Sequence, residues 1–138
     1  SSIAAADLNG DGYSDLVVTT DEGGVVGQSP GHVEVVLGDR LGSFRVGTDV
    51  PTGFSPRAIG APDMNLDGRP DLVVTLGNAG VDVLLGFGDG RFAAATPLGA
   101  SGSNRYDQIA IDDFDLDGAP DVAVAQGNAV VVLMNRGR

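Results

Sequence analysis

Aspartates at a fixed spacing are the residues of this sequence best able to do chemistry. The pattern Asp-x-(Asn/Asp)-x-Asp-Gly-x-x-Asp occurs three times, beginning at residues 7, 63 and 113. Side chains at alternate positions of such a short loop can converge on one point, and their donor atoms are oxygens. Glycine at the sixth position permits the sharp turn that directs the next backbone carbonyl inward. The spacing therefore predicts an oxygen cage around a hard cation.

Each cage is predicted to use the side chains at positions 1, 3, 5 and 9 and the backbone carbonyl at position 7, where the residue type varies. Five or more oxygens with room for water suit Ca²⁺ better than Mg²⁺, and zinc is disfavoured without His or Cys ligands. We therefore expect three Ca²⁺ sites, one in each repeat. Their candidate ligands are Asp7, Asn9, Asp11, Tyr13 and Asp15; Asp63, Asn65, Asp67, Arg69 and Asp71; and Asp113, Asp115, Asp117, Ala119 and Asp121.

Two other interpretations of these loops are possible. An EF-hand needs an acidic ligand at position 12, but Val18, Val74 and Val124 occupy that position here. Solvated turns are the second alternative, because Asp, Asn and Gly form them readily without any metal. Three copies of the full pattern favour the metal interpretation over solvated turns.

The charge of the chain supports this prediction. Ten of its nineteen acidic residues lie in the three loops, and the net charge of -11 would become -5 if each loop held one divalent cation.

The eight basic residues are all Arg, and nucleic acid is an unexpected partner for so acidic a chain. The lack of Cys excludes disulfides and thiolate sites. No apolar run approaches the roughly 18 residues of a membrane span, so we expect no membrane insertion and a soluble chain.

The loops must be positioned by repeated elements, because the sequence aligns with itself without gaps over residues 3–18, 59–74 and 109–124. After each loop, two short apolar runs separated by a Gly-rich break have the lengths and β-branched residues of strands. We expect four-stranded antiparallel repeats at 1–55, 56–105 and 106–138 in a single domain, the last lacking its outer strand. The runs are 16–20 and 33–37, 72–76 and 81–85, and 122–125 and 130–134.

The predicted fold is all-β, built from β-propeller blades. A β-sandwich would also give many short strands, but it would not require the same loop at the same place in each unit. Three blades do not close a ring, since propellers typically have roughly four to eight blades. The chain is therefore expected to be a partial propeller, either a piece of a larger ring or a unit whose copies assemble to complete one.

The repeats resemble the FG-GAP/VCBS repeats of integrin α-subunits and of many secreted bacterial proteins. The second repeat has Gly60-Ala61-Pro62 before its loop and Phe87-Gly88 after it. The resemblance implies that the calcium loop joins the innermost strand to the second strand, in rings of about seven blades. It also implies an extracellular adhesion or ligand-binding module, lectin-like or protein-binding, with Ca²⁺ stabilising the loops. The alternatives are a purely structural repeat and a non-catalytic scaffold within a larger secreted polysaccharide-active enzyme.

Location and activity follow from the same observations. Extracellular calcium modules bind as weakly as ~10⁻⁴–10⁻³ M, so loops of this kind indicate a secreted or cell-surface protein. Abundant Gly, Ala and Arg without Lys favours a bacterial source, and any signal peptide is expected to be already removed. No nucleophile motif accompanies the single histidine, His32, so we expect no enzymatic activity and assign His32 no role.

A protein or glycan ligand is expected on the face opposite the calcium loops. Candidate contacts are the segment 21–32 and the connections holding Arg57, Arg105, Tyr106 and Asp107. Ordinary surface ion pairs are the alternative role for Arg57 and Arg105. Glycan binding normally uses stacking aromatics, and two Tyr, five Phe and no Trp weaken the lectin interpretation.

Overall fold

The computed structural model describes residues 1–21, 30–77, 80–99 and 106–136, which form eleven strands and no helix. The predicted all-β fold is confirmed. No membrane-crossing helix occurs in these described segments. The strands are β1 (Ile3–Ala6), β2 (Asp15–Asp21), β3 (Pro30–Gly38), β4 (Phe44–Phe54), β5 (Pro56–Gly60), β6 (Leu72–Leu76), β7 (Gly80–Leu84), β8 (Thr96–Pro97), β9 (Tyr106–Asp112), β10 (Asp121–Gln126) and β11 (Ala129–Leu133).

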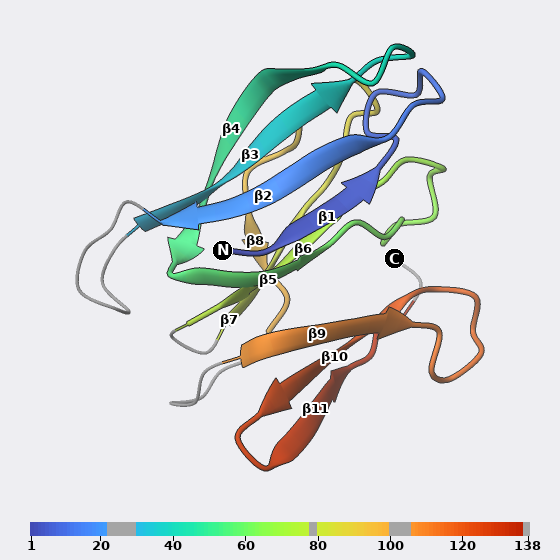
Figure 1. Ribbon diagram of the computed structural model, residues 1–138. Helices are drawn as coiled ribbons and strands as arrows, with labels where there is room; N and C mark the ends of the chain where they lie inside the picture. The colour runs from blue at the N-terminus through green and yellow to red at the C-terminus, as the bar shows by residue number, and fades with distance from the viewer. Residues whose placement is uncertain (22–29, 78–79, 100–105, 137–138) are drawn as a thin grey trace.

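The strands form three antiparallel sheets in which every strand pairs with its neighbour in the chain. Sheet 1 has the order β1-β2-β3-β4, sheet 2 the order β5-β6-β7-β8, and sheet 3 contains β9, β10 and β11 with β10 in the middle. Strand β5 contacts β1 on one side and β9 on the other, so sheet 2 lies between the other two (Figure 1). This stack of meanders confirms the predicted propeller blades in an open arrangement.

Alternating burial shows how the sheets stack. In sheet 1, Val17 and Val33 are fully buried while their sequence neighbours are partly exposed, which is the period-two pattern of a sheet with one covered face. Strand β6 of sheet 2 is buried at all five positions because both of its faces are covered. Its side chains alternate between two cores: Val74 packs with Val17 against sheet 1, and Val73 packs with Val122 against sheet 3.

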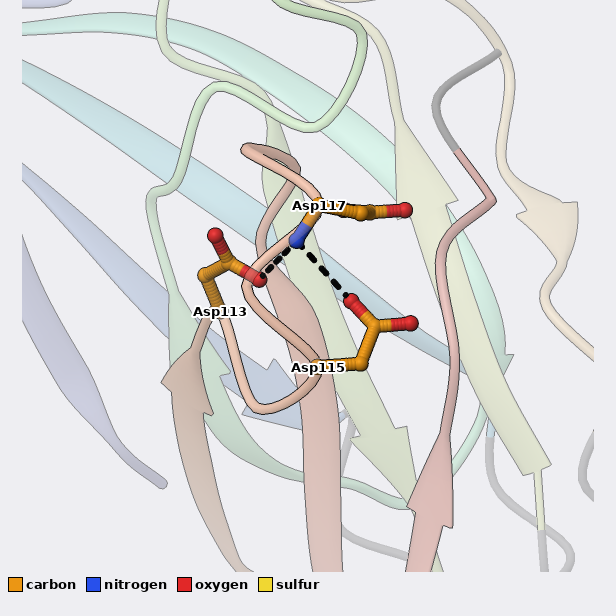
Figure 2. Close-up of side chains that lie close together, drawn as sticks. All are labelled: Asp113, Asp115 and Asp117. Atoms are coloured by element: carbon orange, nitrogen blue, oxygen red, sulfur yellow. Dashed lines mark hydrogen bonds between the residues drawn. The ribbon is translucent and has the colours of Figure 1, made fainter.

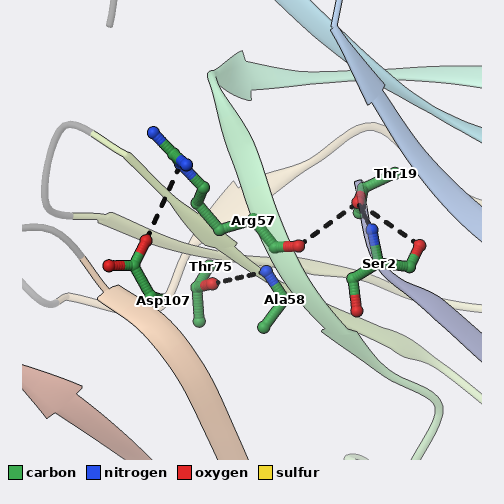
Figure 3. A network of polar contacts seen from close by, with 6 residues as sticks. All are labelled: Ser2, Thr19, Arg57, Ala58, Thr75 and Asp107. Carbon is green, nitrogen blue, oxygen red and sulfur yellow. Dashed lines mark hydrogen bonds and ion pairs between the residues drawn. The ribbon is translucent and has the colours of Figure 1, made fainter. Parts of the chain in front are cut away.

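Two buried threonines tie the first strands to the second strands (Figure 3). Thr19 Oγ1 accepts a hydrogen bond from the Ser2 amide at 2.7 Å and lies 3.3 Å from the Arg57 carbonyl oxygen of sheet 2, to which it can donate. Thr75 Oγ1 accepts a hydrogen bond from the Ala58 amide at 2.9 Å. The third sheet has Ala125 at this position, and the β9–β10 register shifts there, between Val124 and Gln126.

The three Asp loops follow the same backbone path, and two positions of each loop lie in the left-handed region. At position 6 the residue is always Gly, for example Gly118 at φ 93°. At position 4, Gly10 has φ 75°, whereas Leu66 and Leu116 adopt φ 59° and 62°. A left-handed conformation costs a leucine roughly 1–2 kcal/mol because its Cβ crowds the following carbonyl oxygen. The two leucines are therefore strained where the first loop has glycine.

Replacing Leu116 with Asn should stabilise the chain by about 1 kcal/mol, because asparagine tolerates the left-handed region. Leu116 is 87% exposed, so the substitution removes no core packing. Urea denaturation measures the effect. The matched control is Leu41→Asn: Leu41 is 78% exposed and has no positive φ, so its replacement should leave the midpoint unchanged. Equal shifts in both variants would contradict strain as the cause.

Candidate metal sites

The three Asp loops join the first strand of each sheet to the second and project from the same end of the sheets, on the right in Figure 1. Loop 1 (residues 7–15) connects β1 to β2, loop 2 (63–71) connects β5 to β6, and loop 3 (113–121) connects β9 to β10. The predicted ligands therefore lie in three separate loops, five in each loop.

In loop 3, three carboxylates converge (Figure 2). One oxygen from each of Asp113, Asp115 and Asp117 lies within 4.8 Å of the others. Oxygens that ligate Ca²⁺ at about 2.3–2.6 Å can lie this far apart on opposite sides of one ion. Among the residues described, no basic side chain forms a salt bridge with them. The donor set and its spacing therefore fit a calcium ion.

The first Asp of each loop shapes the turn by accepting backbone amides. Asp113 accepts the amides of Asp117 at 3.0 Å and Gly118 at 2.8 Å, one on each carboxylate oxygen. Asp63 repeats both bonds with Asp67 and Gly68 at the same two distances. A carboxylate offers about four lone-pair sites, so oxygen lone pairs remain for a cation. The loop is held in its curved form by bonds of its own.

The third position distinguishes loop 3 from the other two. In loop 1 the Asn9 side-chain amide donates to Asp11 Oδ2 at 3.0 Å, and loop 2 repeats this bond between Asn65 and Asp67 at 3.1 Å. In loop 3 the corresponding residue is Asp115, which has no amide group to donate. Loop 3 therefore has four carboxylates where the others have three, and its carboxylates repel one another more strongly.

The Asp at position 9 has a role that the sequence analysis did not predict. Each is fully buried, and each carboxylate oxygen accepts a separate backbone amide. One amide is at position 2 of the same loop and the other lies at or beyond the end of the third strand. The donors are Leu8 and Gly38 for Asp15, both at 2.8 Å; Met64 and Gly86 for Asp71, both at 2.8 Å; and Phe114 at 2.9 Å and Asn135 at 2.7 Å for Asp121.

These bonds attach each loop to the end of the third strand of its sheet, which is β3, β7 or β11. Gly38 and Gly86 allow the close approach, because a Cβ at either position would collide with the carbonyl oxygen of Ser14 or Pro70. A glycine after the second apolar run was the signal available in the sequence, and Asn135 replaces it in the third repeat. The metal role of the position-9 residues stays a prediction.

Burial raises the pKa of Asp71, although amide hydrogen bonds from Gly86 and Met64 act in the opposite direction and the negative charge of nearby Asp67 adds to the rise. Removal of this carboxylate from water disfavours its charged form. A cation in loop 2 would favour that form again.

The residue at position 7 of each loop forms a hydrogen bond through its backbone amide. The amides of Tyr13, Arg69 and Ala119 each donate to the position-5 carboxylate at 2.9 Å. These bonds hold the position-5 side chain against the turn. The predicted coordination by the three carbonyl oxygens stays a prediction.

On the opposite end of the sheets, Arg57 Nε lies 3.8 Å from an oxygen of Asp107 (Figure 3), so the ion-pair alternative for Arg57 is confirmed. The expectation that Tyr106 contacts a ligand is wrong: Tyr106 is 1% exposed and packs in the core between sheets 2 and 3. Its position at the start of β9 turns the ring inward. Residues 22–29 and Arg105, also expected to contact a ligand, lie outside the described residues.

Comparison with known proteins places these features in a family. The family model for the FG-GAP-like repeat matches residues 7–74 and 63–124. Each match begins at the first Asp of a loop and ends in the second strand of the following sheet. The chain belongs to the FG-GAP-like repeat family. This FG-GAP chain is also 35% identical over 100 residues to bovine (Bos taurus) phosphatidylinositol-glycan-specific phospholipase D; the similar region covers 59% of the chain and 11% of that relative.

Proposed function

We propose that this chain is a calcium-binding FG-GAP module in which each Asp loop holds one Ca²⁺. The convergence of Asp113, Asp115 and Asp117 within 4.8 Å, without a basic partner among the described residues, is the observation that supports this most. Three like charges held this close repel one another unless a cation lies among them. The amide bonds to the first Asp of each loop support the same proposal, because they curve the loop before any ion arrives.

In this proposal the ions stabilise the blades. Strands β9 and β10 hold the two ends of loop 3 in the folded chain, so we expect the folded chain to bind calcium more tightly than the unfolded chain. An ion that binds only the folded state stabilises it by about 2.7 kcal/mol at a hundredfold excess over its dissociation constant. Each ion also makes the charge of its own loop less negative by two.

Isothermal titration with CaCl₂ tests the proposal, with an expected stoichiometry of three ions per chain. The variant combining Asp11→Asn, Asp67→Asn and Asp117→Asn should lose the binding heat, because each loop loses a central ligand charge. Asp49→Asn is the control, since Asp49 is an exposed carboxylate on β4 outside the loops and should leave all three sites intact. No calcium binding by the wild-type chain would refute the proposal.

Loop 3 should bind calcium most tightly, and Asp115→Asn should weaken its affinity about tenfold. One unit charge a few ångströms from the ion near the surface is worth about 1 kcal/mol or more, and 1.4 kcal/mol is a factor of ten. The luminescence of bound terbium, excited directly and followed as calcium displaces the terbium, measures the affinity. The reciprocal variant Asn9→Asp should strengthen loop 1 by a similar factor. An unchanged affinity in both variants would contradict charge as the determinant.

For the biological role, we propose an extracellular, non-catalytic scaffold within a larger protein. The similarity to a phospholipase supports the scaffold role, because the chain matches only 11% of that enzyme's length. The abundance of calcium outside cells supports the location. Adhesion or lectin-like binding stays a prediction, and glycan-array binding in calcium tests it: specific glycan capture would favour the binding module over the scaffold.

A further inference from the structure

Asn9 differs from every other asparagine of the sequence because glycine follows it. The side-chain amide carbon of an asparagine can be attacked by the backbone nitrogen of the next residue, and a side chain on that next residue hinders the attack. Gly10 has no Cβ and is exposed. The space beside it is open, since the Gly88 carbonyl oxygen, the nearest atom of another segment, would lie 3.8 Å from a Cβ built there. Asn9 and Gly10 therefore form a reactive pair.

Loop 2 holds Asn65 in nearly the same surroundings but without the glycine. Asn9 and Asn65 are both partly buried at position 3 of their loops. Each side-chain oxygen accepts the amide of the position-5 aspartate, at 3.1 Å in loop 1 and 3.2 Å in loop 2. Position 4 is left-handed in both loops, with φ 75° at Gly10 and 59° at Leu66. The two asparagines thus differ mainly in the side chain that follows them.

Hydrogen bonds within loop 1 restrain the reactive pair. The Gly10 amide donates to Asp7 Oδ1 at 2.8 Å, so a carboxylate holds the proton that must leave the attacking nitrogen. The Asn9 side chain is fixed at both of its polar atoms, because Oδ1 accepts the Asp11 amide and Nδ2 donates to Asp11 Oδ2 at 3.0 Å. The attack therefore requires loop 1 to open locally, and exposed loops open at a lower free energy than the core does.

We propose that Asn9 is a deamidation site, reactive when loop 1 opens and protected when the loop is closed around an ion. In the open loop the Gly10 nitrogen bonds to Asn9 Cγ, gives up its proton and displaces the side-chain nitrogen as ammonia, which leaves a succinimide ring. Water then breaks one of the two ring bonds to this nitrogen. Breakage at Cγ gives aspartate, and breakage at the main-chain carbonyl carbon gives isoaspartate. One water is consumed and one ammonia is released.

The two products change loop 1 in different ways. Aspartate at residue 9 gives loop 1 the four carboxylates of loop 3, which has Asp115 at this position. Isoaspartate directs the main chain through the former side chain, which adds one carbon atom to the backbone between positions 1 and 5 and changes the spacing of the predicted ligands. Loop 1 therefore changes covalently during time spent open, whereas loop 2 keeps its asparagine.

Incubation of the chain in EDTA at neutral pH, followed by peptide mass spectrometry, tests the modification without any ion. The peptide containing Asn9 should gain the mass that marks an amide converted to an acid, and the peptide containing Asn65 should not. Exchanges at position 4 test the cause: Gly10→Leu should abolish the conversion, and Leu66→Gly should make Asn65 convert as well. No conversion of Asn9, or equal conversion of both asparagines in the wild type, would overturn the proposal.

Both variants should fold, which circular dichroism verifies. Leucine already occupies position 4 in loops 2 and 3, and glycine occupies it in loop 1. Leu66 is 55% exposed, so Leu66→Gly removes no core packing. If Gly10→Leu were unfolded, the appearance of conversion at Asn65 in Leu66→Gly would still decide whether the glycine is the cause.

A second incubation in calcium tests the protection, which rests on the proposed calcium function. Calcium at a hundredfold excess over its dissociation constant leaves about one loop in a hundred without an ion, so the conversion should slow by about a hundredfold. Equal rates in calcium and in EDTA, in a chain whose titration heat shows bound calcium, would overturn the protection. Equal rates without that heat would refute the calcium function, while conversion of Asn9 in EDTA would still support the modification site.

Discussion

Asp71→Asn is expected to destabilise the chain by about 3 kcal/mol both with and without calcium. The Asp71 carboxylate is 0% exposed and accepts the amides of Met64 and Gly86, both at 2.8 Å. An asparagine would present its own NH₂ group to one of these donors and leave it buried without a partner, a loss of about 1–3 kcal/mol in addition to the weakened second bond. In a chain of this size the melting temperature should fall by roughly 10 °C.

Thermal unfolding in EDTA and in CaCl₂ measures this effect, and Asp67→Asn is the matched control in the same loop. Asp67 is exposed, and the Oδ1 that accepts the Arg69 amide at 2.9 Å has an amide-oxygen counterpart in the variant. The variant loses only the solvent-exposed bond from the Asn65 side-chain amide to Oδ2. The control should therefore lower the melting temperature in calcium alone. If Asp71→Asn unfolds like the wild type in EDTA, the buried hydrogen bonds of Asp71 do not stabilise the fold.

Removal of calcium should produce the largest change in stability. If the three loops bind independently and each ion contributes about 2.7 kcal/mol at a hundredfold excess, the total approaches about 8 kcal/mol. The free energy of unfolding of an ordinary domain is roughly 5–15 kcal/mol, so the calcium-free chain should be only marginally stable. We expect its melting temperature to be lower by roughly 20 °C or more.

Differential scanning calorimetry in CaCl₂, in EDTA, and after calcium is returned to the EDTA sample checks this expectation and its reversibility. The chain with Asp11→Asn, Asp67→Asn and Asp117→Asn should melt at the same temperature in all three conditions. Magnesium should replace calcium poorly, because its compact octahedron retains several waters. Equal melting temperatures of the wild type in calcium and EDTA would contradict a stabilising role for the ions.

Most strands could be predicted from the sequence because their apolar residues are β-branched and repeat in register. The predicted run 72–76 coincides with β6, and the other runs fall within one residue of their strands, except that 33–37 begins three residues after the start of β3. The outer strands were less predictable. Strand β4 extends over Phe44–Phe54, whereas β8 contains only Thr96 and Pro97. Both are largely exposed, so no alternating pattern defines their ends, and Pro97 cannot donate to the ladder.

The Asp loops were also predictable, because their geometry depends on spacing within nine residues. The bonds of the position-9 carboxylates were not, since Gly38 lies 23 positions from Asp15 in the chain and only sheet pairing brings its amide close. Tyr106 illustrates the opposite error. A lone tyrosine beside Arg105 resembles a surface residue in sequence, but the inward-facing first position of β9 buries it.

The pairing of every strand with its sequence neighbour has a consequence for the folding reaction. Contacts between nearby segments form faster than contacts between distant ones, because less chain entropy is lost when a short loop closes. Each sheet of this chain can therefore assemble from one continuous segment before it meets the next. Folding can begin in any of the three sheets and spread outward, as in repeat proteins whose units interact only with their nearest neighbours.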